Sequence, residues 1–310
     1  MIPESEIANS ISVIIPVHNR SRELGRALES LAAQRDPLLE VVVCDDGSTE
    51  DIGAVTSAFQ DRLNVKLVRL SASGGPAEPR NAAVAAAGAP WVSFLDSDDE
   101  WLPGKSAALH SLLSDEIDVL YHRLEVRSEG SCTPSRRVHG THVGSPLRGK
   151  DVLEGFIRWG NPLATSGVTM RRTLLLKHGG FSATVNSLED FDLWLRLASV
   201  GSRFLYVQST LGIYWVHAGS ISSGGALYEY ERYKRLYTRQ LDLLPARYRP
   251  LAESSFGYVL ARKARQAGMN AAAAEHFQLV RPTLTPLCWL MSKALRTLDA
   301  LTAVLRSVRR

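Results

Sequence analysis

Almost uninterrupted apolar runs alternate with amphipathic segments along the N-terminal part of the chain. Runs of this kind are typical of strands that are covered on both faces of a parallel sheet. After the first run, apolar residues recur at helical spacing, which predicts a helix with Ser21 as its cap. The alternation predicts a doubly wound α/β sheet with right-handed crossovers. The predicted strands are Ile11–Val17, Glu40–Cys44, Val65–Leu70 and Trp91–Leu95.

Polar residues directly follow three of these runs. In open α/β sheets, ligands bind beyond the carboxyl ends of the strands. Five polar side chains at one edge of the predicted sheet are more than unrelated loops would supply, so we expect a ligand site there. These side chains are Asn19, Asp45, Asp46, Asp96 and Asp98.

The fourth run leads directly into a cluster of carboxylates. Their charges repel one another unless a cation lies among them. Carboxylate oxygens suit hard ions such as Mg²⁺ or Mn²⁺. The spacing of Asp96 and Asp98 places both carboxylates on one side of an extended backbone, where a metal would bridge the protein and a diphosphate. The alternative is a solvated acidic turn, which is common after a strand.

A second acidic pair, Glu189 and Asp190, begins a predicted helix whose apolar residues share one face. The positive end of the helix dipole favours anions at this position. The pair is therefore either a charge cap or a place where a general base is held in its ionised form. Further along, His217 is a candidate metal ligand or diphosphate contact, although a lone histidine more often has a structural role.

The composition is that of an ordinary soluble globular protein, with 310 residues, 45% of them apolar and 22% charged. A net charge of only +4 does not indicate bulk binding of nucleic acid. Three cysteines far apart in the sequence favour a reducing compartment. We find no signal peptide, and no apolar run of the roughly 18–20 residues that a spanning helix needs. These features predict a cytoplasmic protein.

The length of the chain allows two parts. We expect a catalytic domain over residues 1–225 and a helical extension over residues 226–310. In the first part, a short strand is expected at Val119–Tyr121, and residues 127–149 predict a variable loop or hairpin on the acceptor side. The helices expected in the extension are Leu227–Leu244, Leu251–Gln266 and Ala271–Leu279.

The last segment predicts an amphipathic helix after Pro286, with a wide apolar stripe. Residues 281–310 carry six basic residues and one acidic residue. A basic amphipathic helix with a tryptophan, here Trp289, predicts attachment to a membrane surface. The inner face of the plasma membrane would fit a lipid-linked acceptor. The alternative is that the stripe packs on the protein or on a second subunit.

Five short motifs also occur in order, at Val13–Asn19, Asp45–Ser48, Gly74–Asn81, Phe94–Asp99 and Glu189–Arg196. Each is weak alone, but together they resemble the family 2 glycosyltransferases of the GT-A fold, over roughly residues 9–225. The resemblance implies a nucleotide-diphospho-sugar transferase fold, with a Rossmann-like mixed sheet flanked by helices and a C-terminal helical extension.

In function, the resemblance implies an inverting transfer that uses Mn²⁺ or Mg²⁺ as cofactor. The sugar would move from a nucleotide-diphosphate sugar, in the first instance a UDP-sugar, to an acceptor hydroxyl. The acceptor would be a saccharide or a lipid-linked glycan in the synthesis of a cell-surface polysaccharide or glycolipid.

The resemblance also assigns roles to individual residues. Asp190 matches the catalytic base, and Glu189 would support the acceptor or orient that base. Asp98 matches the metal ligand of the DXD motif, with Asp96 near the ribose and the metal, and His217 as a further ligand. The nucleotide would contact Pro16, Val17, Asn19, Asp45, Asp46, Arg80 and Asp96.

The chemistry agrees with this assignment, with one departure. A diphosphate leaving group develops charge that needs a cation, which a carboxylate-held metal supplies. One base opposite the leaving group suffices for a single in-line displacement. Trp215, however, stands where many relatives carry arginine, so we expect the contacts to the diphosphate to differ in this chain.

Other functions remain open. A sugar nucleotidyltransferase would share the sheet and the acidic site, but it needs a Gly-rich phosphate loop where this chain has Pro16–Asn19. A Rossmann dehydrogenase needs G-x-G-x-x-G at the same place, which is also absent. A non-catalytic sugar-nucleotide-binding protein would have lost its chemistry, whereas Asp98 and Asp190 are both present.

Overall fold

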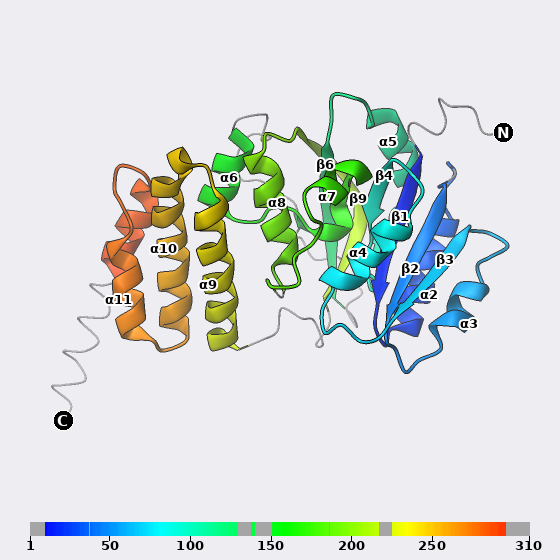
Figure 1. Cartoon of the computed structure of the whole chain (residues 1–310), viewed down its shortest axis with the longest axis horizontal. Helices are drawn as coiled ribbons and strands as arrows, with labels where there is room; N and C mark the ends of the chain where they lie inside the picture. The colour runs from blue at the N-terminus through cyan, green and yellow to red at the C-terminus, as the bar shows by residue number, and fades with distance from the viewer. Residues whose placement is uncertain are drawn as a thin grey trace. The chain divides into compact units, whose positions relative to one another are not determined.

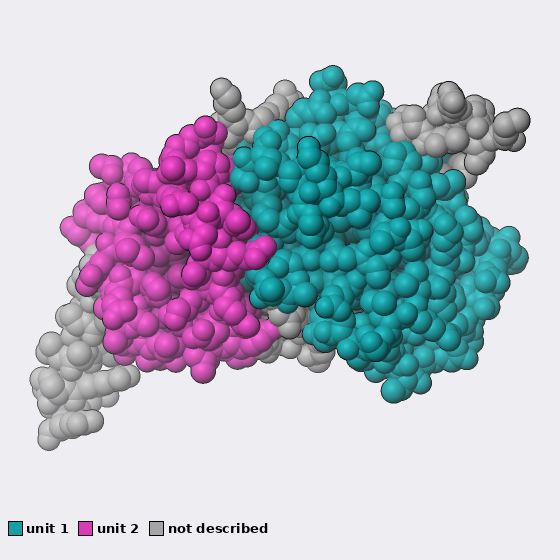
Figure 2. Space-filling view, in the orientation of Figure 1, with its two compact units in different colours: residues 1–152, 161–220 teal, residues 153–160, 221–310 magenta. Residues whose placement is uncertain are grey.

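The computed structural model describes residues 10–36, 38–128, 138–139, 151–185, 187–216 and 225–295. Contacts divide the chain into two compact units, which Figure 2 shows in different colours. Unit 1 comprises residues 1–152 and 161–220, and unit 2 comprises residues 153–160 and 221–310. The predicted boundary at residue 225 stays a prediction, because residues 217–224 lie outside the described part of the chain.

Unit 1 is built on one mixed sheet (Figure 1). Its strands are β1 (Ile11–Val17), β2 (Glu40–Asp46), β3 (Val65–Leu70), β4 (Trp91–Phe94), β5 (Glu100–Trp101), β6 (Val119–Ser128), β7 (Val138–His139), β8 (Val168–Arg171) and β9 (Phe204–Val216). The strand order is β3-β2-β1-β4-β8-β6-β9-β5, and β7 pairs with β6. β1 is parallel to β2 and β4, whereas β8 is antiparallel to β4 and β6. The predicted mixed sheet is confirmed: the strands from β3 to β4 are parallel, β8 is antiparallel to both of its neighbours, and β6 pairs parallel with β9.

The helices of this unit are α2 (Ser21–Ala32), α3 (Ile52–Ser57), α4 (Ala77–Ala86), α5 (Lys105–Leu112), α7 (Arg172–Lys177) and α8 (Glu189–Ser199). Every residue of β1 and β2 is buried, as expected for strands that are covered on both faces. α2 covers them with the apolar face that its sequence spacing predicts. That face consists of Leu24, Ala27, Leu28 and Leu31, and it belongs to the same core as β1 and β2.

The predicted cap of α2 is wrong. The helix begins at Ser21 itself, and Arg20 precedes it without a capping hydrogen bond from its side chain. Instead, the backbone N–H of Ser21 donates to the carboxylate of Glu50 at 2.7 Å. A carboxylate from the loop after β2 therefore supplies the negative charge that a helix N-terminus favours.

β6 is longer than the predicted strand, because it continues to Ser128 and pairs with β9 along its length. From Arg123 onward, half-buried charged residues alternate with the buried Leu124 and Val126. This period of two is that of a strand with one covered face. Residues 127 and 128 are thus strand rather than loop, and β7 pairs antiparallel with β6 as in a hairpin. Residues 129–137 and 140–149 lie outside the described residues.

Unit 2 is helical. Its helices α9 (Ala226–Leu243), α10 (Arg249–Gln266) and α11 (Asn270–Gln278) lie side by side, with α10 packed against both others (Figure 1). Tyr237 of α9 stacks on Phe256 of α10 with 3.9 Å between ring centroids. Most of α6 (Asp151–Trp159) belongs to this unit, and residues 286–295 form a further helix. The predicted helical extension is therefore confirmed. Among the described residues, none of the helices combines the length and apolarity that crossing a membrane requires.

Candidate active site

The loops after β1 and β2 are joined through Asn19. This residue has a positive φ of 49°, a region in which asparagine is enriched among residues other than glycine. Its side-chain oxygen accepts a hydrogen bond from the backbone N–H of Thr49 at 2.7 Å, and its own N–H donates to the hydroxyl of Ser48 at 2.9 Å. Pro16 and Val17 are buried in β1, so any contact that they make with a ligand would come from their backbone.

Asp45 and Asp46 end β2, and they are only 7% and 6% exposed. Asp45 accepts a hydrogen bond from the backbone N–H of Ser48 at 3.0 Å. Asp46 accepts two from Ser73, one from its N–H at 2.8 Å and one from its hydroxyl at 2.9 Å. These bonds satisfy two nearly buried carboxylates and at the same time shape the loops after β2 and β3.

Arg80 of α4 connects three segments of the site. Its guanidinium contacts Asp96 at 2.7 Å and Glu189 at 2.5 Å, and it lies 5.3 Å from the centroid of the Phe181 ring. Arg80 is only 4% exposed. Although burial alone would lower the pKa of Arg80, the charges of Asp96 and Glu189 raise it above its ordinary value. Arg80 is therefore a permanently charged link between α4, the loop after β4 and the start of α8.

The acidic segment after β4 forms a turn, closed by a hydrogen bond from the N–H of Asp99 to the carbonyl of Asp96 at 3.0 Å. The prediction that Asp96 and Asp98 lie on one side of an extended backbone is therefore wrong. Asp96 faces Arg80, whereas Asp98 forms an ion pair with Arg20. Burial, together with the charges of Asp96 and Asp98, raises the pKa of Asp99 well above its ordinary value.

The acidic turn offers carboxylate oxygens that suit a divalent cation, but it does not supply a full set of protein ligands. Among the described residues, no group of three or more acidic, histidine or cysteine side chains is arranged to hold a metal. His217, the predicted third ligand, lies outside them. Asp96 and Asp98 nevertheless offer hard oxygen atoms, and their charges add to the effect of burial in raising the pKa of Asp99. Mg²⁺ is commonly held by one or two carboxylates together with phosphate and water, so the residues fit such an ion.

Asp190 lies half-buried in the first turn of α8. Its Oδ1 accepts a hydrogen bond from the N–H of Phe191 at 2.6 Å. Its Oδ2 accepts hydrogen bonds from the Asn161 amide at 3.2 Å and the Thr165 hydroxyl at 3.3 Å. Burial and the adjacent charge of Glu189 raise the pKa of Asp190 to about 6, against the opposite effect of Arg80. A carboxylate with this pKa is suited to accept a proton near neutral pH.

A short helical turn, η1 (Thr165–Gly167), links Asp190 to the acidic turn and was not identified from the sequence. The hydroxyl of Ser166 accepts a hydrogen bond from the N–H of Asp96 at 3.0 Å and donates to Asp99 at 2.5 Å. The buried ammonium of Lys105 donates to the Ser166 carbonyl at 3.0 Å. No periodicity or spacing distinguishes these residues from ordinary polar positions, because their importance comes from partners far away in the sequence.

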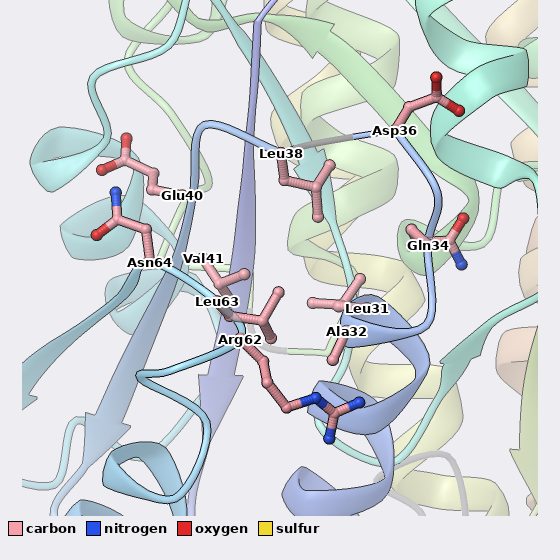
Figure 3. Close-up of a pocket in the computed structure, with 10 residues that line it drawn as sticks. All are labelled: Leu31, Ala32, Gln34, Asp36, Leu38, Glu40, Val41, Arg62, Leu63 and Asn64. Carbon is pink, nitrogen blue, oxygen red and sulfur yellow. The ribbon is translucent and has the colours of Figure 1, made fainter.

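A cavity of about 120 Å³ lies elsewhere in unit 1 (Figure 3). It is lined by the end of α2, the start of β2 and the segment before β3, including Leu31, Glu40 and Asn64. Glu40 begins β2, whereas Asp45 and Asp46 end it, so the cavity lies at the opposite end of the strand from the polar loops. We therefore place the candidate active site at the carboxyl edge of the sheet and not in this cavity.

Comparisons of the sequence identify relatives. The profile of Glycosyl transferase family 2 matches residues 12–178, more than half of the chain. The succinoglycan biosynthesis protein ExoU of Rhizobium meliloti is 31% identical over 248 residues, which cover 76% of this chain and 69% of that protein. The UDP-Glc:alpha-D-GlcNAc-diphosphoundecaprenol beta-1,3-glucosyltransferase WfaP of Escherichia coli is 26% identical over 216 residues, 69% of this chain and 80% of that protein. An uncharacterized glycosyltransferase of Haemophilus influenzae is 29% identical over 192 residues, 60% of this chain but only 61% of that relative's length.

Solved structures share the fold. Staphylococcus aureus TarS 1-349 in complex with UDP-GlcNAc superposes with a TM-score of 0.65 at 23% identity, covering 89% of this chain and 82% of that chain. The mannosyltransferase PcManGT from Pyrobaculum calidifontis in complex with GDP-Man and Mn²⁺ superposes with a TM-score of 0.58 at 17% identity, covering 95% and 80%. At these identities the likeness concerns the fold alone, and it confirms the fold that the sequence motifs imply.

Replacing Arg80 with alanine should strongly destabilise unit 1. The substitution leaves the buried carboxylate of Glu189 and the half-buried carboxylate of Asp96 without their shared cation, which costs about 3 kcal/mol of unfolding free energy. Urea denaturation measures this loss. Arg62→Ala, which breaks an exposed pair with Glu29, is the control and should change stability little. Equal stability of the two variants would contradict the structural role of Arg80.

Proposed function

Because the chain belongs to glycosyl transferase family 2, we propose that it transfers a sugar from a nucleotide-diphosphate sugar to an acceptor hydroxyl with inversion. The observation that carries this proposal is the arrangement of Asp190. This carboxylate, with a pKa of about 6, lies at the sheet edge that also carries Asp96 and Asp98. Arg80 and the Thr165–Gly167 turn connect the two groups, so a base and a donor site occur together.

The donor would bind across the loops after β1, β2 and β4. We assign the nucleoside to Asn19 and Asp45, with the backbone of Pro16 and Val17, because these residues meet at the ends of β1 and β2. Arg20, next to Asn19, pairs with Asp98 of the acidic turn. Asp46 shapes the same loop through Ser73, and Arg80 and Asp96 lie next to the diphosphate position. The names of WfaP and of the TarS complex, which mention UDP-Glc and UDP-GlcNAc, support a UDP-sugar as the first donor to test.

Asp98, with Asp96, would hold a divalent ion, Mn²⁺ or Mg²⁺, and His217 remains the proposed further ligand. When bound, such an ion stabilises the charge that develops on the diphosphate leaving group. PcManGT, which shares the fold, was solved with Mn²⁺. The carboxylates contribute hard oxygen atoms, and the diphosphate and water would complete the coordination.

Asp190 would remove the proton from the acceptor hydroxyl as that oxygen attacks the anomeric carbon. Asn161 and Thr165 both donate to its Oδ2, and these two bonds fix the rotation of the carboxylate. Glu189 is buried against Arg80, so in this state it acts on Asp190 through its charge and position. A mechanism that uses one base and no enzyme nucleophile is a single displacement and therefore gives inversion.

The acceptor is proposed to be a saccharide or lipid-linked glycan, because relatives such as ExoU and WfaP are named for succinoglycan and for a diphosphoundecaprenol acceptor. In unit 2, the helix at residues 286–295 turns apolar side chains outward. Leu287, Leu290 and Met291 are 59%, 58% and 44% exposed, whereas Ser292 on its other face is fully buried. We therefore propose that this helix binds the membrane surface that carries a lipid-linked acceptor. A second copy of the chain is the alternative partner.

A thermal-shift series tests donor and metal together. UDP with Mn²⁺ should raise the melting temperature, since a ligand that binds only the folded state stabilises it by about 2.7 kcal/mol at a hundredfold excess over Kd. UDP or Mn²⁺ alone should have smaller effects. GDP, dTDP and CMP, each with and without Mn²⁺, complete the series. Stabilisation by a different nucleotide would change the donor class, and no shift with any of them would contradict a donor site.

Replacing Asp190 with asparagine should reduce transfer at least ~100-fold while nucleotide binding is kept, since only the proton acceptor is lost. For the unmodified chain, kcat/KM should fall about tenfold per pH unit below a pH of about 6, because the raised pKa protonates the base there. The residual activity of Asp190→Asn should not show this fall in kcat/KM at low pH. Asp61→Asn, at an exposed position, is the control. Wild-type turnover by the Asp190 variant would refute the assignment.

Co-sedimentation with vesicles tests the exposed helix. The chain should bind vesicles that contain anionic lipid, and replacing Leu287 and Leu290 with serine should abolish binding because the apolar contact is lost. Leu243→Ser, at another exposed leucine of unit 2, is the matched control. If the double variant sediments like the wild type, this helix is not the membrane contact. If the wild type is a dimer in analytical ultracentrifugation and the double variant is a monomer, the partner of this helix is instead a second copy of the chain.

A further inference from the structure

One ion pair ties the proposed nucleotide loop to the proposed metal turn. Arg20 directly follows Asn19, and its guanidinium contacts the Oδ2 atom of Asp98. The two side chains are 26% and 17% exposed, so water and small ligands can reach them. Because β1 and β4 are neighbouring parallel strands, the pair spans the sheet edge where nucleotide and metal are proposed to meet.

The backbone of Asp98 is held separately by Arg26. Its Nη2 donates to the carbonyl of Asp98 at 2.8 Å, and its Nε contacts Glu100 at 2.9 Å. The guanidinium also stacks 4.5 Å from the ring of Trp215, whose indole N–H donates to Glu100 at 2.8 Å. These contacts keep the turn in place, so the carboxylate of Asp98 can change its partner by side-chain motion alone.

The same turn crowds negative charge. Asp96 pairs with Arg80, Glu100 pairs with Arg26, and Asp98 pairs with Arg20. A divalent cation that binds to Asp98 would take the place of the Arg20 guanidinium. A diphosphate brings new anionic oxygens to the same edge, and arginine binds such oxygens with good geometry.

We propose that Arg20 is a built-in counterion of Asp98, which competes with the divalent metal and transfers to the diphosphate when nucleotide and metal bind together. The inference rests on the proposed function. It predicts positive coupling between the two ligands. Metal that binds alone must disrupt the Arg20–Asp98 pair. When nucleotide is also present, Arg20 gains a phosphate as its new partner. Each ligand should therefore raise the affinity of the chain for the other by the same factor.

Electron paramagnetic resonance of free Mn²⁺ measures this coupling, with UDP and GDP as parallel nucleotide probes. Wild-type chain should bind Mn²⁺ more tightly when the nucleotide is present. Arg20→Gln should bind Mn²⁺ alone about fivefold more tightly than wild type, because the competing cation is gone. The factor by which nucleotide increases the affinity for Mn²⁺ should be at least about fivefold smaller in Arg20→Gln than in wild type. Arg20→Lys, which keeps the charge but not the planar fork, should lie between the two.

Arg22→Gln is the matched control, because Arg22 is an exposed arginine two residues after Arg20, in the first turn of α2, and it should behave like wild type. Circular dichroism verifies that each variant is folded. If Arg20→Gln binds Mn²⁺ alone no more tightly than wild type and keeps the full effect of nucleotide, the counterion role is wrong although the donor site stands. If wild type binds no Mn²⁺ with either nucleotide, the proposed metal site fails and the counterion role fails with it.

Discussion

The buried guanidinium of Arg80 is the interaction on which the site depends. A charge that is removed from water is tolerated only when it is closely paired, and Arg80 finds two carboxylates. Asp96 lies 16 residues after Arg80 in the sequence, just beyond β4, and Glu189 lies 109 residues after Arg80, at the start of α8. The requirement to pair this charge therefore determines how closely α8 approaches the sheet edge, and with it the position of Asp190.

The properties of Asp190 follow from the same electrostatics. The charge of Glu189 favours the protonated form of Asp190, and the charge of Arg80 favours the ionised form. Removal from water adds to the first effect, and the resulting pKa of about 6 is close to neutral pH. A pair of acids at a helix N-terminus would by itself be a plain charge cap. The half-buried position and the charge of the neighbouring Glu189 make Asp190 suited to proton transfer.

The carboxyl edge of the sheet combines acids that would repel one another with cations that come from separate elements. Arg26 of α2, Arg80 of α4 and Lys105 of α5 each reach this edge with different partners. Ser166 adds neutral hydrogen bonds that hold the acidic turn, and the neighbouring Thr165 holds the proposed base. An anionic donor can bind to such an edge only when cations offset the carboxylates. A divalent ion at Asp98 and an arginine that moves to the diphosphate would both supply such positive charge.

By itself, the sequence determined strands β1 to β4, helix α2, the acidic segment after β4 and the pair that begins α8, whereas the long strand β9 was not predicted. These features depend on local periodicity and on which residues end each strand, and both can be read along the chain. The partners of the individual side chains could not be predicted from the sequence. The turn that sends Asp96 toward Arg80 and Asp98 toward Arg20 was predicted as extended, and the links through Ser166 carried no signal. Partners of this kind come from segments that meet only when the sheet and its helices assemble, so the tertiary structure decides which charges meet and therefore where the proposed base, Asp190, lies.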